Sequence, residues 1–180
     1  MLLQEAAPLE SVSSFNGAGI YAIYYAGDFA PYSAIAERNR EGKFEAPIYV
    51  GKAIPAGARK GNVGLDVPTG PVLTKRLKEH ADSINIASNL DLADFWCRYL
   101  VIDDIWIPLG ESLLIARYSP IWNKYIDGFG NHDPGKGRYQ QLRSLWDVLH
   151  PGRPWAEKCQ GRKETQEQIA EDVRAYLSNI

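Results

Sequence analysis

The chain has 180 residues, of which 45% are hydrophobic and 23% charged, a composition typical of one globular domain with its own core. It has no run of eighteen or more apolar residues, so we expect no membrane span. Its first ten residues lack the basic start and the apolar stretch of a secretory signal. Cys97 and Cys159 fit neither a disulfide framework nor metal-ligand spacing. We therefore expect an intracellular, cytoplasmic protein.

The net charge is -2, but basic and acidic residues are concentrated in different segments of the chain. Residues 38–80 hold nine Lys/Arg against four Asp/Glu, and residues 124–163 hold eight against four, whereas the rest holds three against fourteen. A fold that joined the two basic segments would present a positive face suited to a phosphate backbone. The alternative is that these are solvated charges scattered over the surface, and composition alone does not decide between the two.

Hydrophobic patterning predicts three strands and five helices. Runs rich in aromatic and β-branched residues, bounded by Gly or Pro, predict strands over residues 17–26, 47–53 and 95–102. Apolar residues at helical spacing predict helices over residues 33–41, 71–87, 108–118, 138–149 and 165–178. The order of elements predicts an α/β (α+β) fold, with a small mixed sheet of at least three strands flanked by helices and a C-terminal helical extension.

The first two predicted strands carry the motifs Gly-Ile-Tyr (residues 19–21) and Tyr-Val-Gly (residues 49–51). Four polar residues then follow in order: Arg76, His80, Glu111 and Asn123. A three-letter motif arises often by chance, but this ordered set on these element types resembles the GIY-YIG nuclease superfamily over residues 15–160. The resemblance implies a GIY-YIG endonuclease core that hydrolyses phosphodiester bonds.

The spacing of the motifs points to one branch of the superfamily. The two motifs usually form a simple hairpin, whereas residues 22–48 intervene here. This insertion, together with segments 128–138, 146–153 and 155–159, is similar to the Type II restriction endonucleases that cut the palindrome CCGCGG. The resemblance implies a nuclease domain over 15–163 with its insertion at 22–48. Weak patterning over 1–14 indicates an N-terminal arm, and the acidic, amphipathic pattern near the end indicates a peripheral helix over 164–180.

The resemblance also implies a role for each polar residue. Tyr21 is the candidate general base near the attacking water, and its pKa of about 10 would have to be lowered by a nearby cation or metal. His80 would take a proton from Tyr21 or hold the Tyr21 hydroxyl by a hydrogen bond. Whether Tyr21 or His80 finally accepts the proton of the water stays open. Tyr49 would position the phosphate or the water, and Arg76 would clamp the scissile phosphate.

Glu111 is the candidate ligand for one divalent cation per active site, Mg²⁺ (or Mn²⁺), because such ions favour carboxylate and water oxygens. Asn123 would brace the site, and Lys52 would touch the phosphate or tune the tyrosines. Each residue has a simpler structural interpretation: core aromatics for the tyrosines, a solvated helix face for the Arg–His pair, and the helix dipole for Glu111. The joint order of the residues favours the nuclease.

Cutting both strands of a palindrome favours a homodimer on double-stranded DNA. Guanine edges or phosphates would be contacted by basic residues of the predicted loops: Arg38, Arg40, Arg59, Lys60, Lys136 and Arg138. A cognate DNA methyltransferase is the expected genetic partner. The alternatives are a repair or homing nuclease on the same scaffold, and a non-catalytic DNA-binding module.

Two further histidines have simple structural interpretations. His132 lacks a second ligand at metal spacing, so we interpret it as a turn residue. His150 precedes Pro151 at the end of a predicted helix, where a cation suits the helix dipole.

Overall fold

The computed structural model describes residues 1, 4–55 and 70–178. Its sheet has the strand order β1-β4-β2-β3. The strands are β1 (Ala7–Pro8), β2 (Gly19–Tyr25), β3 (Pro47–Ala53) and β4 (Phe95–Val101). All three pairings in this sheet are antiparallel, where we expected a mixed sheet, because β3 and β4 both return alongside β2, one on each side of it.

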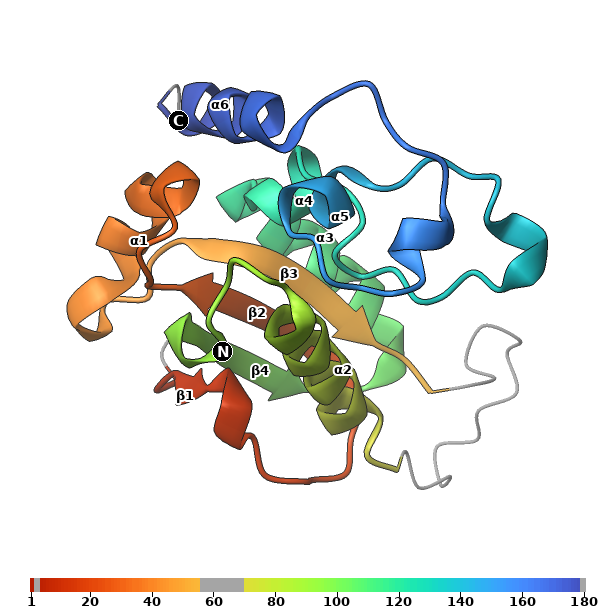
Figure 1. Cartoon of the computed structure of the whole chain (residues 1–180). Helices are drawn as coiled ribbons and strands as arrows, with labels where there is room; N and C mark the ends of the chain where they lie inside the picture. The colour runs from red at the N-terminus through yellow and green to blue at the C-terminus, as the bar shows by residue number, and fades with distance from the viewer. Residues whose placement is uncertain (2–3, 56–69, 179–180) are drawn as a thin grey trace.

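Helices cover both faces of the sheet, which confirms the α+β class. They are α1 (Ser33–Asn39), α2 (Val72–Ile86), α3 (Ile107–Tyr118), α4 (Ile121–Lys124), α5 (Leu145–Leu149) and α6 (Gln166–Leu177). Figure 1 shows α2 on the near face of the sheet and α3 behind it, with α6 along the upper edge of the molecule. No helix among the described residues is both long and apolar enough to cross a bilayer.

Strand β2 lies at the centre of the fold, and all seven of its residues are buried. Side chains alternate between the two faces of a strand. Tyr21 and Ile23 accordingly pack in the core cluster that contains Leu77 of α2. Ile20 instead packs with Ile107 of α3. Because both faces are covered, the strand is a nearly continuous apolar run in the sequence.

The N-terminal residues contribute to the sheet and the core. Ala7–Pro8 pairs with β4, and the nearby side chains of Leu9 and Val12 are buried. A two-residue strand is too short to leave a periodic pattern, so patterning predicted three of the four strands that the described residues form.

The predicted helix over 138–149 is wrong in its first half. The helix begins only after Ser144, whose hydroxyl accepts a hydrogen bond from the Asp147 amide and so acts as its N-cap. The preceding residues form a 3-10 turn over Lys136–Arg138 and a further turn, and Leu142 then forms a parallel bridge with Gln160. Pairing with a distant segment therefore overrode the helical spacing of the apolar residues.

His150 is a buried neutral residue rather than a cation at a helix end. Its Nδ1 lies 2.9 Å from Asn89 Oδ1, and its Nε2 lies 2.7 Å from the Tyr32 hydroxyl, which also accepts a bond from Trp122. Burial lowers the pKa of His150 to about 3. The neutral imidazole can then donate from Nδ1 and accept at Nε2, so it joins the C-terminal part of the chain to the segment around Tyr32.

This histidine should make folding stability depend on pH. Its pKa in the folded protein is below the unfolded value of 6.5, so its contribution is complete above pH 6.5 and is lost as the pH falls toward 3. We expect the free energy of unfolding to decrease by about 1.4 kcal/mol per pH unit from this one group over that range. Urea unfolding of the wild type and of His150→Gln between about pH 7 and pH 4.5 measures the slope. Glutamine keeps a donor and an acceptor but does not titrate, so a variant as steep as the wild type would contradict the assignment.

Candidate active site

The two motif tyrosines lie on neighbouring strands and on the same face of the sheet. Their ring centroids are 6.2 Å apart. Tyr21 is paired across the strands with Gly51, and a Cβ added to that glycine would lie 2.4 Å from the Tyr21 hydroxyl oxygen. The glycine of the second motif therefore makes room for the phenol of the first. Tyr49 is partly exposed, whereas Tyr21 is completely buried.

Helix α2 places His80 against Tyr21. The Tyr21 hydroxyl is 2.6 Å from His80 Nε2, and His80 is only 1% exposed. Burial raises the pKa of Tyr21 well above its usual value, with Tyr49 adding to the rise and Arg76 opposing it. Burial also lowers the pKa of His80, and the positive charges of Arg76 and Arg153 lower it further. Both groups are thus neutral at neutral pH, with the phenol donating to the imidazole.

A role as general base requires a cation that lowers the pKa of Tyr21. Arg76 acts in that direction, but burial outweighs it. The protein's own groups therefore favour a hydrogen-bonded phenol over a phenolate.

Arg76 lies one helical turn before His80 and is held from three sides. Its guanidinium donates to Glu79 Oε2 at 3.0 Å, to the Gly130 carbonyl at 2.8 Å and to His132 Nε2. Its side chain is 20% exposed, so it lies at the rim above the buried Tyr21–His80 pair. His132 is therefore more than a turn residue, since it contacts the guanidinium directly.

The segment around Phe129 closes the site from the C-terminal side, and sequence reasoning missed it. The Phe129 ring stacks on His80 with centroids 4.5 Å apart and planes at 17°. The backbone at Gly130 approaches so closely that a Cβ there would lie 2.9 Å from the Tyr49 hydroxyl. Arg153, only 3% exposed, donates to the carbonyls of Gly128 and Phe129. Backbone carbonyls leave no residue pattern, and the glycines of segment 128–138 were the one available signal.

Glu111 reaches the site from α3 on the other face of the sheet. Its Oε2 accepts from Lys52 Nζ at 2.5 Å, and the two side chains are 18% and 32% exposed. The Glu111 charge raises the pKa of both Tyr21 and Tyr49, although it is not the main cause for either. The carboxylate thus lies within electrostatic range of both phenols, beside the edge strand β3.

Asn123 fastens β3 through its backbone. The Val50 amide donates to Asn123 Oδ1 at 2.8 Å, and Asn123 Nδ2 donates to the Val50 carbonyl at 2.8 Å. Because β3 is an edge strand, the amide pairs two backbone groups that would otherwise lack a partner strand. Val50 lies between Tyr49 and Gly51, so this contact holds the second motif in place.

The chain matches the family model described as the Eco29kI GIY-YIG domain over residues 13–177, which is most of its length. The chain belongs to this family. Eco29kI GIY-YIG proteins form a restriction endonuclease family, so membership gives the protein a nuclease role and a DNA substrate. No curated protein matches the chain significantly.

In this Eco29kI-family chain, the donor set suits a cation held by few protein ligands. The described residues contain no group of three or more His, Cys, Asp or Glu that could hold a metal ion. Glu111 Oε1 makes no hydrogen bond within the part of the chain that the structure describes. Mg²⁺ keeps several waters and takes one or two carboxylates beside phosphate oxygens. One partly exposed carboxylate at the rim therefore fits such an ion.

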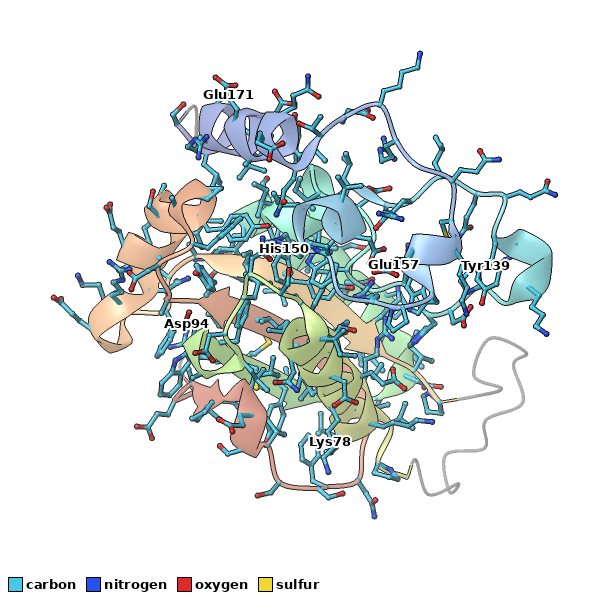
Figure 2. The ribbon with its side chains drawn as sticks, in the orientation of Figure 1. Lys78, Asp94, Tyr139, His150, Glu157 and Glu171 are labelled. Carbon is cyan, nitrogen blue, oxygen red and sulfur yellow. The ribbon has the colours of Figure 1, made fainter. Side chains whose placement is uncertain are left out.

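The predicted DNA-contacting residues are not gathered at one place. Arg38 is exposed on α1, and Arg40, just after it, is bonded to Asp28 and to the Gly27 carbonyl. Lys136 and Arg138 are exposed beside Tyr139, on the opposite side of the molecule from α1 (Figures 1 and 2). Arg59 and Lys60 lie outside the described residues. The contact of each with DNA stays a prediction.

We expect Asn123→Asp to test the bracing of the second motif. The substitution sets an oxygen against the Val50 carbonyl, which loses its donor, so the free energy of unfolding should decrease by about 1–3 kcal/mol. Denaturant unfolding measures the loss. Asn131→Asp is the matched control. Asn131 is exposed, and its substitution introduces the same negative charge nearby. Equal effects of the two substitutions would assign the loss to charge and not to the two hydrogen bonds.

Proposed function

We propose that the protein is a Type II restriction endonuclease that hydrolyses a phosphodiester bond in each strand of a short palindromic site, with CCGCGG as the first candidate. The observation that carries the proposal is the convergence of groups with complementary tasks. A buried phenol–imidazole pair lies beneath a partly exposed guanidinium, and a carboxylate–lysine pair lies within electrostatic range of the phenol. These groups match the needs of phosphodiester hydrolysis: proton removal from water, charge stabilisation at phosphorus and help for the leaving oxygen.

The proton path begins at the attacking water. As the water loses its proton to the Tyr21 oxygen, the phenol's own proton passes to His80 Nε2 over the 2.6 Å contact. The phenolate therefore never has to persist in a buried site, which its raised pKa would oppose. We propose His80 as the final acceptor. A bound phosphate beside Arg76 would offset the positive charge that depresses the His80 pKa.

Arg76 and Lys52 hold the phosphate. Arg76 presents a planar guanidinium that can form two parallel bonds to phosphate oxygens, and its present partners keep it extended at the rim. Lys52 adds a second cation next to Glu111. Glu111 would bind one Mg²⁺ or Mn²⁺ per active site, and such an ion stabilises negative charge on the leaving 3′ oxygen. We propose a homodimer on the two-fold DNA site and a cognate methyltransferase that protects host DNA.

Removing the Glu111 carboxylate should abolish cleavage. Purified wild type is incubated with unmethylated phage DNA and Mg²⁺ or Mn²⁺, beside Glu111→Ala and the control Glu171→Ala on the distant helix α6 (Figure 2). We expect discrete fragments from the wild type and the control, and a rate at least about 10³-fold lower for Glu111→Ala. A random smear from the wild type would contradict site specificity. No cleavage with either ion would contradict the proposed endonuclease activity.

Tyr21→Phe separates proton transfer from binding. Phenylalanine keeps the buried ring but removes the hydroxyl, so site binding should stay nearly normal while cleavage falls about 10²–10⁴-fold. Single-turnover cleavage measures the rate, and a gel-shift assay on the same oligonucleotide duplex measures the affinity for the site. Tyr139→Phe is the matched control, since it removes an exposed hydroxyl bonded to Asp133. Wild-type turnover in Tyr21→Phe would take Tyr21 out of the proton path.

A further inference from the structure

Arg153 is a buried cation in the C-terminal third of the chain, and its guanidinium faces the backbone of a distant segment. The residue is only 3% exposed. Its Nη1 donates to the Gly128 carbonyl at 3.0 Å, and its Nη2 donates to the Phe129 carbonyl at 2.5 Å. The Asp147 carboxylate lies 3.4 Å from Nη1 and supplies an opposite charge inside the protein. The planar fork of the guanidinium therefore holds two successive carbonyls at once, a geometry that a lysine ammonium lacks.

The surroundings of Arg153 are themselves fixed at the start of α5. The Ser144 hydroxyl donates to Asp147 Oδ2 at 2.7 Å, and the guanidinium lies 4.2 Å from the centroid of the Trp146 ring. Gly128 has a φ of 104°, and a Cβ there would lie 2.0 Å from the Ser144 hydroxyl oxygen. Only glycine therefore lets the backbone come close enough to α5 to be held by the arginine.

The backbone that Arg153 holds contacts two groups of the active site. The Phe129 ring stacks on the His80 imidazole with centroids 4.5 Å apart. The next carbonyl, that of Gly130, accepts a hydrogen bond from Arg76 Nη2 at 2.8 Å. The imidazole and the guanidinium thus rest on one short segment, and that segment is tied to the interior by a single side chain.

We propose that Arg153 is a positioning residue of the active site: by fixing the carbonyls of residues 128 and 129, it sets the orientation of the His80 imidazole and of the Arg76 guanidinium. The inference deepens the proposed function and rests on it, because that function assigns the proton to His80 and the phosphate to Arg76. A misplacement of about 1 Å can lower a rate about 100-fold, whereas DNA binding is spread over many phosphate contacts. Loosening the segment should therefore slow cleavage more than it weakens binding.

Arg153→Lys tests this role, because lysine keeps the positive charge beside Asp147 and loses the planar fork. On a duplex that the wild type cuts, we expect the single-turnover cleavage rate to fall about 10–100-fold and the Kd to stay within about threefold. Arg143→Lys is the matched control, because Arg143 also donates to a backbone carbonyl in this part of the chain, but that carbonyl belongs to Ala156. The control should cut at the wild-type rate. A wild-type rate in Arg153→Lys would overturn the proposal.

Proton NMR of the DNA-free protein separates positioning from a general loss of stability. The chain has three histidines, so their ring resonances can be assigned by substitution. The Phe129 ring lies over His80 with the two planes at 17°, and an aromatic face shifts the protons above it upfield. We expect Arg153→Lys to move the His80 ring protons downfield and Arg143→Lys to leave them in place. Thermal unfolding checks that the variants are folded. A slower Arg153→Lys with wild-type His80 resonances would overturn the proposal.

A double variant answers the same question if lysine prevents folding. Arg153→Met combined with Asp147→Asn removes both charges together, so neither is left buried without its partner, and such replacements often retain stability. Asp147→Asn alone keeps the guanidinium fork and is the control. We expect the double variant to show the slow cleavage and the downfield His80 protons, and the control to show neither. A folded double variant with the wild-type rate or the wild-type resonances would overturn the proposal.

The NMR comparison needs neither DNA nor cleavage, so its outcome is separate from that of the proposed function. A wild type that cuts no DNA would contradict the endonuclease, while a downfield shift of the His80 protons in Arg153→Lys would still support the positioning of the imidazole. An active enzyme whose rate and His80 resonances ignore Arg153→Lys would contradict the positioning role alone.

Discussion

The hydrogen bond between the Tyr21 hydroxyl and His80 Nε2 is the contact on which the rest of the site depends. It joins the central strand to α2 inside the core, where an unpaired hydroxyl or ring nitrogen would cost about 1–3 kcal/mol. Its geometry requires a glycine at position 51, where any Cβ would meet the phenol. The contact therefore stabilises the fold and also prepares a path for a proton. Burial sets the protonation of both partners, because it raises the pKa of the phenol and lowers that of the imidazole.

The C-terminal third of the chain builds the other half of the site. Arg153, paired with Asp147 in the interior, holds the carbonyls of residues 128 and 129, and the next residue, Gly130, accepts a hydrogen bond from Arg76. The buried Arg153 thus positions Arg76 through three residues of backbone, 128–130. This connection gives a physical reason why the family match continues past the motifs into the C-terminal third of the chain.

The inner side of helix α3 brings Glu111 to Lys52 at the edge of the sheet. Because a helix is a rigid element, its packing on the sheet gives the carboxylate a defined position beside the edge strand β3.

The sequence by itself determined the α+β class, the three long strands and most of the helices, and it supplied the candidate site residues. Four-residue spacing in a helix is a local property, so it places Arg76 one turn before His80. Alternation gives the two faces of each strand, but the register between β2 and β3 puts Tyr21 and Tyr49 on the same face. Only the tertiary structure decided the antiparallel sheet, the late start of the helix in residues 138–149, the contacts of His132 and Arg153, and the neutral state of His150. Each of these depends on which distant segment covers a residue, and burial by distant segments is what sets a pKa or replaces a local helix with a pairing. Such contacts leave no periodic trace in the chain that makes them.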